Sequence, residues 1–451
     1  MGTIGIFNSA TPQRSNAIPF LMASSETALS FSRLGREIAS PVIVDLMARA
    51  LANSDLLSLA AGFTDNVALP RGLVGRFAAE LTQGGLDDEP LQYGQNQGRS
   101  RLRELSCQYL AAQPGECAEA FDPAAMFISN GSQQALYLAV QALCDPGDIV
   151  LVEEPSYFVC LEMLRGLGLR PIGIPCEGDG AIQADGLAEL LRELDSAGER
   201  SKVKAIYLVS YFCNPSSRSL SLGEKRAIAR VLLDVGYEIP VIEDAAYREL
   251  YFDAPHPAPS ILSMPEFAPF PKLYLGTYTK PFATGLKIGY GCCTHSEWLE
   301  KILCIKGHQD FGSAHFSQAI IERVLDAGLF QDHLAFIQKH YAEKAFVLDH
   351  ALREGGLREV GWKWHQPAGG LIFWLRAPEG SDLRMESVFC KGCIEQGVLY
   401  VPGELCSASG GLWHCARLSS GALPPNKLRE AAGRFVAQAG VLAQSSGSSG
   451  S

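Results

Sequence analysis

Residues 272–291 read KLYLGTYTKPFATGLKIGYG. After Lys272 comes a short apolar run of strand character, 273–275, and then two hydroxyl residues, Thr277 and Thr279. Lys280 follows them directly, and Lys287 comes seven residues later. A lysine at the end of a buried strand can hold an aldehyde as a Schiff base, while nearby hydroxyls and a second cation hold a phosphate. A surface lysine in a strand-to-loop turn is the alternative, which so short a motif does not exclude.

On the N-terminal side of this stretch, short apolar runs alternate with amphipathic helical patterns. The apolar runs predict strands at 126–128, 149–152, 203–209, 239–242 and 273–275. Helical patterns separate several of them, at 133–143, 187–194 and 222–235. This alternation predicts an α/β fold with a mostly parallel sheet that helices cover on both faces.

Ligands of such sheets bind beyond the carboxyl ends of the strands. Here those ends carry a hydroxyl, a ring, an amide, a carboxylate and an amine, at Ser132, Tyr157, Asn214, Asp244 and Lys280. Ser132 opens a predicted helix, where free backbone amides favour an anion, although an ordinary capped loop would look the same. We therefore expect one crevice in which these groups converge.

The regions on either side of this core predict a second, smaller domain. Beyond residue 310 a helical pattern at 317–353 precedes apolar runs at 369–375, 398–403 and 416–419 and a last helix at 425–442. Strands mixed with helices indicate an α+β domain. At the N-terminus, residues 1–25 are expected to be loosely ordered and 38–51 to form a helix.

These patterns divide the chain into four parts. Residues 1–55 form an N-terminal segment that joins the small domain, and 56–310 form the large domain. Residues 311–443 form the small C-terminal domain, and 444–451 a flexible tail. We expect the two domains to pack closely against each other, since no long linker separates them in the sequence.

Composition excludes several classes of protein. The 451 residues are 47% hydrophobic and 19% charged, as in ordinary globular proteins. A formal charge of -11 argues against nucleic-acid and membrane-surface binding. No apolar segment is long enough to span a bilayer, and no secretion signal opens the chain, so we expect a cytoplasmic protein.

Cysteine and histidine spacing predicts no metal site. The 13 cysteines are odd in number and irregularly spaced, which favours buried thiols in a reducing compartment. Cys390 and Cys393 form a single CxxC pair, whereas a structural zinc usually takes four ligands.

Six motifs together carry a family resemblance. NGSQQAL, EEPSY, CNP, EDAAY, GTYTK and GLKIGYG follow one another between residues 130 and 291. In this order and spacing the chain resembles class I/II aminotransferases, which are fold type I enzymes that depend on pyridoxal 5'-phosphate. It looks closest to the 2-aminoadipate and aromatic aminotransferase branch, over residues 31–439. The resemblance implies a large domain with a mostly parallel sheet and a smaller α+β domain.

The resemblance also implies roles for individual residues at the ring of the cofactor. Lys280 would form the Schiff base with pyridoxal 5'-phosphate and then move protons. Asp244 would pair with the pyridine nitrogen, so that the ring accepts electrons. Asn214 and Tyr247 would donate hydrogen bonds to the phenolic oxygen, and Tyr157 would stack on the ring. A helix N-cap is the structural alternative for Asp244.

Further residues would hold the phosphate and the substrate. The phosphate ligands implied by the resemblance are Ser132, Gln133, Thr277, Thr279 and Lys287, together with Tyr93 from a partner subunit, which implies a homodimer with shared sites. Arg417 would bind the substrate carboxylate through a bidentate fork, with Asn214 beside it, and Gly62 would let a loop approach the substrate. A surface arginine is the alternative at 417.

Two positions depart from the family pattern. Lys287 stands where the family usually has arginine, so one point charge replaces a fork of two hydrogen bonds. Pro281 and Phe282 are bulkier than the small residues usual after the Schiff-base lysine.

The expected function is transfer of an amino group from an α-amino acid to a 2-oxo acid by a ping-pong mechanism. A lyase, decarboxylase, cyclase or oxidase would use the same residues, because they create a carbanion without deciding its fate. A regulator's sensing module would need a basic helix-turn-helix, for which the roughly thirty residues before the family-like region are too few.

Overall fold

The structure is a computed structural model that describes residues 30–38, 55–83 and 90–447. The loosely ordered segment expected at residues 1–25 lies outside the described residues, as does nearly all of the helix expected at 38–51. Among the described residues, none of the helices combines the length and apolar character needed to cross a bilayer.

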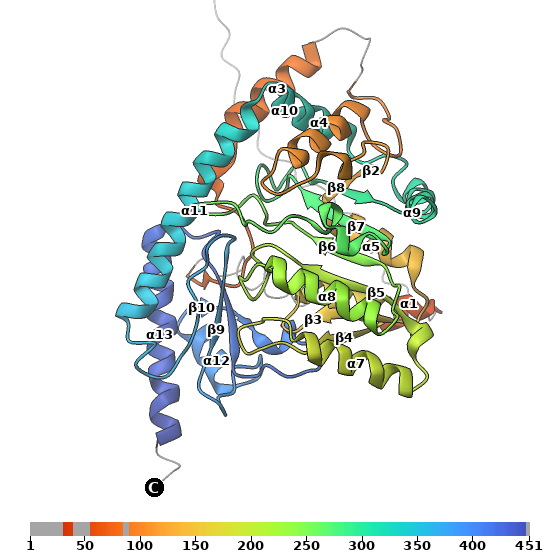
Figure 1. The fold of residues 1–451 in the computed structure, drawn as a ribbon. Helices are drawn as coiled ribbons and strands as arrows, with labels where there is room; N and C mark the ends of the chain where they lie inside the picture. The colour runs from red at the N-terminus through yellow and green to blue at the C-terminus, as the bar shows by residue number, and fades with distance from the viewer. Residues whose placement is uncertain (1–29, 39–54, 84–89, 448–451) are drawn as a thin grey trace, which may run out of the picture.

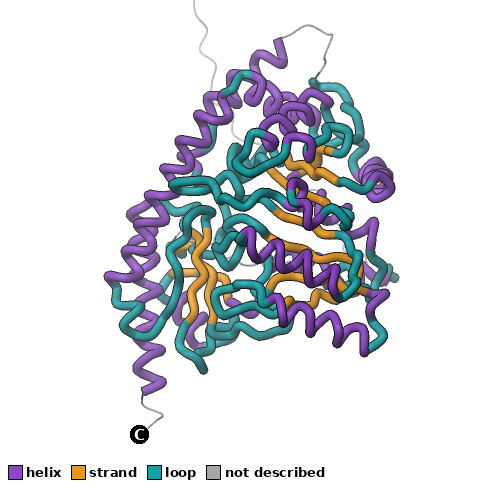
Figure 2. The backbone as a smooth tube through the Cα atoms, in the orientation of Figure 1, coloured by secondary structure: helices purple, strands orange, loops and turns teal. Residues whose placement is uncertain are grey.

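A seven-stranded sheet forms the centre of the molecule (Figure 2). Its strands, in spatial order, are β2 Met126–Asn130, β8 Ile288–Cys293, β7 Lys272–Thr277, β6 Val241–Asp244, β5 Val203–Val209, β3 Ile149–Glu153 and β4 Arg170–Ile174. Only β8 runs antiparallel to its neighbours within this sheet. The predicted α/β fold with a mostly parallel sheet is therefore confirmed, although the sequence pattern had not indicated β4 and β8.

Helices cover both faces of this sheet because its strands are apolar on both sides. One face packs against α5 Gly131–Leu143, α6 Phe158–Gly166 and α9 Ser296–Gln309. The other face packs against α7 Ala184–Ser196 and α8 Leu222–Asp234. Because all strands of this sheet except β8 run in the same direction, their carboxyl ends lie at the same edge of the sheet.

A further apolar core lies at the β2 and β8 end of the sheet. Its helices are α3 Arg71–Gln83, α4 Ser100–Ala111 and α10 His315–Asp326. Figure 1 shows these three helices together at the top of the molecule.

Several further helices are short. Helix α1, Arg33–Glu37, is capped by Ser32, whose side chain accepts a hydrogen bond from Gly35 N. Short 3-10 helices lie in the connections: η1 Asn66–Ala68, η3 Ala118–Ala120, η4 Arg200–Lys202, η5 Ile261–Ser263, η6 Pro265–Phe267 and η7 Gly403–Cys406.

The C-terminal third builds a separate sheet and core. Strands β11 Val401–Pro402, β12 Cys415–Ser419 and β9 Ile372–Arg376 form an antiparallel sheet. Its core includes residues of α11 Leu329–Glu354, α12 Val388–Glu395 and α13 Pro425–Gly447. Figure 1 shows α11 and α13 side by side along one flank. The N-terminal strand β1 Leu57–Ser58 pairs with β10 Val398–Leu399 of this region. The exact domain boundaries stay a prediction.

Two helical predictions need correction. The helix expected over 317–353 is two helices, α10 and α11, which Gly328 separates with a φ of 70°. Glycine adopts this left-handed conformation without strain, so it ends the first helix. The last helix, expected over 425–442, extends further and ends at Gly447 as α13.

Candidate active site

A crevice lies beyond the carboxyl ends of the central strands. Its lining residues are Asn130, Gly131, Ser132, Gln133, Tyr157, Tyr207, Val209, Asn214, Asp244, Ala246, Tyr247, Thr277, Thr279, Lys280 and Lys287. The structure thus brings together all of the predicted site residues except Tyr93, Gly62 and Arg417. The last two reach its edge through hydrogen bonds to Lys280 and Asn214.

Lys280 is the amine of this crevice and follows the end of β7 by three residues. Its Nζ donates a hydrogen bond to the carbonyl oxygen of Gly62 at 2.6 Å. Burial and, to a lesser extent, the positive charges of Arg417 and Lys287 together lower the pKa of Lys280 from 10.5 to about 8. Within the described part of the chain, no carboxylate forms an ion pair with it. This amine therefore loses its proton more easily than a lysine in water, and the deprotonated amine is the nucleophilic form.

Asp244 ends β6 and is only 6% exposed. Its Oδ2 accepts a hydrogen bond from the Tyr207 hydroxyl at 2.8 Å, and its Oδ1 accepts one from Ala246 N at 3.0 Å. Burial raises the pKa of Asp244, whereas these two hydrogen bonds act to lower it. A buried carboxylate with donors on both oxygens is fixed in orientation and suited to pair with a cationic ring nitrogen.

A hydrogen-bonded chain links the large sheet to the small one. Asn214 Nδ2 donates to the Tyr247 hydroxyl at 3.5 Å, and Arg417 Nη1 donates to Asn214 Oδ1 at 3.4 Å. Arg417, on β12, is 1% exposed and also donates through Nη2 to the Ala60 carbonyl oxygen. Its buried Nε has no hydrogen-bond partner among the described residues. The guanidinium is therefore held in place while N–H groups, that of Nε among them, remain available for an acceptor such as a carboxylate.

The N-terminus of α5 forms the opposite end of the crevice. Gly131 begins the helix with a φ of 73°, and Ser132 and Gln133 follow in its first turn. The hydroxyl oxygen of Thr279 is buried without a hydrogen-bond partner in the described chain. Free helix amides beside an unpaired hydroxyl make a site for an anion such as phosphate.

Strand β8 supports this helix end through Gly289. A side-chain carbon added at Gly289 would lie 2.5 Å from Ser132 N and 2.8 Å from Gly131 Cα. Such distances exclude any side chain, so the strand backbone packs directly against the first turn of α5.

The two threonines of the crevice differ in the state of their hydroxyls. Thr277 Oγ1 donates to the Ile288 carbonyl oxygen at 3.1 Å and accepts from Thr279 N at 3.0 Å. Since a hydroxyl carries one hydrogen, Thr277 shapes the loop, and Thr279 is the threonine whose hydroxyl hydrogen is available. Lys287 lies exposed at the rim with a φ of 58°, where its amine supplies a point charge.

Tyr93 and Gly62 lie outside the group that lines the crevice. Tyr93 is 81% exposed and packs edge to face against Phe311, with ring centroids 6.1 Å apart. Gly62 contacts Lys280 through its carbonyl, and a side chain there would meet no atom within 4 Å. The packing of the chain itself therefore does not require glycine at position 62.

Tyr207 is a site residue that the sequence reasoning missed. It lies inside the apolar strand β5, where a tyrosine is an ordinary strand residue. The signal that could have found it is the alternation of side chains along the strand, which puts Tyr207 on the same face as Val209, beside Asp244.

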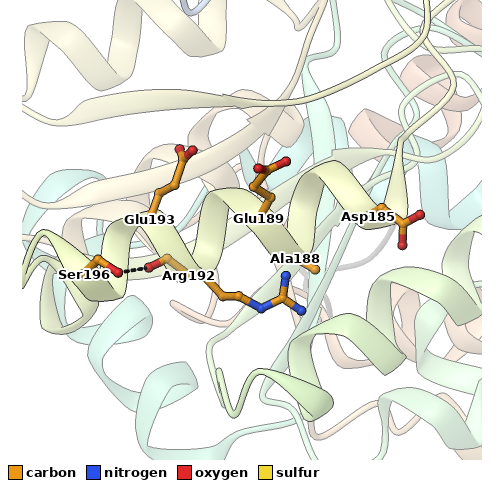
Figure 3. A pocket seen from close by; sticks show the side chains of 6 residues that line it. All are labelled: Asp185, Ala188, Glu189, Arg192, Glu193 and Ser196. Atoms are coloured by element: carbon orange, nitrogen blue, oxygen red, sulfur yellow. Dashed lines mark hydrogen bonds between the residues drawn. The ribbon is translucent and has the colours of Figure 1, made fainter.

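A larger hollow lies elsewhere, along the solvent face of α7. Its lining residues are Asp185, Ala188, Glu189, Arg192, Glu193 and Ser196 (Figure 3). All come from one helix, and Figure 3 shows Arg192 pointing away from Glu189 and Glu193. The Ser196 hydroxyl bonds to the Arg192 carbonyl oxygen, at 2.9 Å. This is a solvated helix face without converging groups.

The described residues contain no group of three or more histidine, cysteine, aspartate or glutamate side chains that could hold a metal ion.

Comparisons with known proteins agree with this geometry. The family model for class I and II aminotransferases matches residues 69–435. An aromatic-amino-acid aminotransferase from Thermococcus litoralis is 29% identical over 86% of this chain and 89% of its own. A 2-aminoadipate transaminase from Thermus thermophilus is 30% identical over 84% of this chain and 89% of its own.

Among solved structures, the Pyrococcus horikoshii kynurenine aminotransferase, in complex with PMP, superposes with a TM-score of 0.81. It is 28% identical, and the match covers 91% of this chain and 97% of that one. Sequence, fold and crevice therefore agree, and the chain belongs to the class I and II aminotransferase family.

Proposed function

We propose that the crevice binds pyridoxal 5'-phosphate and that Lys280 is the amine that takes up its aldehyde. The observation that carries this proposal is one crevice holding three complementary groups. They are an amine and a hydroxyl at a helix N-terminus, which have no counter-charge and no hydrogen-bond partner, respectively, among the described residues, and a doubly hydrogen-bonded carboxylate. When bound, the cofactor supplies an electron sink that stabilises negative charge on the α carbon of the substrate.

The remaining residues would orient this group and its substrate. Asp244 would keep the ring nitrogen protonated, and Asn214 and Tyr247 would donate to the phenolic oxygen. Burial raises the pKa of Tyr247 to about 12, so its phenol stays protonated and able to donate. Tyr157 would cover the ring. The phosphate would lie on the first turn of α5, near Ser132, Gln133, Thr277, Thr279 and Lys287.

The reaction would move an amino group from an α-amino acid to a 2-oxo acid by a ping-pong mechanism. Arg417 would bind the α-carboxylate of both substrates, since its buried Nε still has a donor to offer. Lys280, freed of the aldehyde, would take the proton from the α carbon. The relatives are named as an aminotransferase and a transaminase, which supports transfer of an amino group. Among the described residues, no feature of the crevice favours a lyase, decarboxylase, cyclase or oxidase.

The active unit would be a homodimer in which Tyr93 serves the phosphate of the partner subunit. Tyr93 lies on an exposed apolar surface with Leu91 and Phe311, which are 67% and 64% exposed. Large exposed apolar groups that cluster in this way usually lie in an interface. We also propose the division into a large domain at 56–310 and a small one at 311–443. The N-terminal segment at 1–55 would join the small domain, as the hydrogen bond from Arg434 Nη1 on α13 to the Asp55 carbonyl oxygen supports.

The test combines trapping and a half-reaction. Protein made with pyridoxal 5'-phosphate is reduced with borohydride, and peptide mass spectrometry should locate the added mass on Lys280. A panel of amino acids, without an oxo acid, should then leave pyridoxamine phosphate in unreduced enzyme. Colourless protein or mass on another lysine would refute the proposal for the site. Product release without pyridoxamine phosphate would instead indicate one of the non-transferring reactions.

A further inference from the structure

Tyr207 lies inside the crevice but has no role in the function proposed above. Its side chain is fully buried, and its hydroxyl donates to Asp244 Oδ2 at 2.8 Å. Ala246 N provides the other hydrogen bond to this carboxylate, on Oδ1 at 3.0 Å. Tyr207 is thus the one side chain that hydrogen-bonds Asp244 within the described residues.

The sheet register explains why the two side chains meet. Tyr207 pairs with Ile242, and Val209 pairs with Asp244, across the parallel strands β5 and β6. Residues two apart on a strand share a face, so Tyr207 and Asp244 both lie on the face that bears the crevice. Their neighbours Leu208 and Glu243 lie on the opposite face, and Leu208 packs there in a different apolar core. The contact therefore follows from backbone pairing.

The charge of Asp244 depends on such donors. An almost fully buried carboxylate favours its neutral form, and burial accordingly raises the pKa of Asp244. The hydroxyl of Tyr207 opposes this effect by stabilising the anion. Burial also raises the pKa of Tyr207 well above 10, so the phenol keeps its hydrogen throughout the physiological range.

We infer that Tyr207 is a positioning residue that acts through Asp244: it orients this carboxylate and keeps it anionic, so that it can hold a protonated ring nitrogen. The inference rests on the proposed binding of pyridoxal 5'-phosphate. Tyr207 touches Asp244 rather than the reacting atoms, so its removal should change the protonation behaviour of the site more than its architecture.

Tyr207→Phe removes the hydroxyl and keeps the ring. The readout is the dissociation constant of pyridoxal 5'-phosphate, measured by fluorescence titration of apoprotein from pH 5 to pH 9. A hydrogen bond to a charged group is strong enough to move a pKa by about one unit. The acid limb of the profile, where affinity falls as the pH decreases, should therefore shift to higher pH by about one unit. Binding should be about tenfold weaker on that limb and change little at pH 9.

Tyr237→Phe is the matched control. Tyr237 is also buried, and its hydroxyl donates to an aspartate, Asp195 Oδ1, at 3.0 Å, but it packs in the core on the opposite face of the sheet. This substitution should leave the acid limb in place. Equal loss of affinity at every pH in Tyr207→Phe would indicate a purely structural role and overturn the inference.

A second background separates this inference from the proposed function. Lys280 also titrates in this range, with a pKa of about 8, so all variants keep that part of the profile. Asp244→Asn removes the carboxylate charge, so the part of the acid limb that depends on Asp244 should be absent, and adding Tyr207→Phe should change the affinity less than twofold. A tenfold further loss there would show that Tyr207 does not act through the carboxylate. If wild-type apoprotein binds no pyridoxal 5'-phosphate at all, the proposed function fails together with this inference. If it binds and the limb does not move, only the inference fails.

Discussion

Lys225 on α8 and Lys280 after β7 are both lysines withdrawn from water, but their surroundings differ. Lys225 is fully buried, and its Nζ donates to Glu243 Oε1 and to the Pro259 carbonyl oxygen, each at 2.7 Å. Lys280 has a backbone carbonyl as its partner, that of Gly62, and two cations among its neighbours.

The comparison teaches that the partner, more than burial, decides what a buried amine does. Burial lowers the pKa of both amines, but at Lys225 the charge of Glu243 acts in the opposite direction. At Lys280 the neighbouring charges of Arg417 and Lys287 add to the effect of burial. The first lysine is thus fixed as half of an ion pair, and the second is left available for chemistry.

Replacement of the reactive lysine should have the largest effect. Lys280→Ala should lower turnover by at least about 10³-fold, because it removes both the nucleophile and the group that moves protons. The free energy of unfolding should stay the same or rise, since no counter-charge is left unpaired. Steady-state assays and urea unfolding measure the two quantities, and Lys301→Ala, at an exposed site, is the control. A variant that retained turnover would contradict the assigned role.

Replacement of the structural lysine should do the reverse. Lys225→Ala should lower the free energy of unfolding by about 3–5 kcal/mol, because it leaves the Glu243 carboxylate buried without its cation. Urea unfolding followed by circular dichroism measures this loss. Lys202→Ala breaks the exposed pair with Glu199 and should cost less than about 1 kcal/mol. Equal losses in the two variants would show that burial does not matter here.

The lowered pKa of Lys280 should also make the stability of the apoprotein depend on pH. The pKa of Lys280 falls from 10.5 in the unfolded chain to about 8 in the folded apoprotein. Between these values the unfolded chain binds more protons, so Lys280 makes the free energy of unfolding rise as the pH increases from about 8 toward 10.5. Lys280→Met should remove this rise. Subtracting the unfolding curves of the two apoproteins isolates it, and a flat or falling difference would contradict the lowered pKa.

The smallest effect is expected from rebuilding the ion pair without charge. Lys225→Met with Glu243→Gln removes both charges and keeps a side-chain oxygen that can accept from Ile261 N, as Glu243 Oε2 does at 2.9 Å. The double variant should be roughly 1–3 kcal/mol more stable than Lys225→Met alone, because no buried charge is left unpaired. Urea unfolding of the wild type and of the two variants measures these differences. A double variant less stable than the single one would show that Glu243 does not need its cation.

The sequence pattern predicted most of the central sheet because its strands are apolar and regularly separated by helices. The strand predicted at 203–209 matches β5, and the helix predicted at 222–235 begins with α8 at the capping box of Ser221 and Glu224. The sequence pattern did not indicate β8, because Lys287, Gly289 and Gly291 interrupt the apolar pattern at and after the start of this strand. Nor did it show the break at Gly328, because a single glycine is also tolerated inside a helix.

The crevice was predictable where a side chain ends a strand, as Asp244 does, or lies in the loop after one, as Asn214 and Lys280 do. Features that depend on pairing between strands were not. The contact of Tyr207 with Asp244 needs the register of β5 on β6, and the engaged hydroxyl of Thr277 needs the neighbouring strand β8. Chemistry carried by one segment can be inferred from sequence, whereas hydrogen-bond partners from another segment require the fold.

The close packing of Gly289 against the first turn of α5 excludes every other amino acid at that position, because each carries a side-chain carbon. Alanine there would push the helix start off the sheet and turn its amides away from the crevice. A saturation library scored for cofactor retention would therefore accept a single amino acid at a residue that donates no side chain to catalysis. Invariance at position 289 among relatives would then report a steric boundary rather than a chemical role.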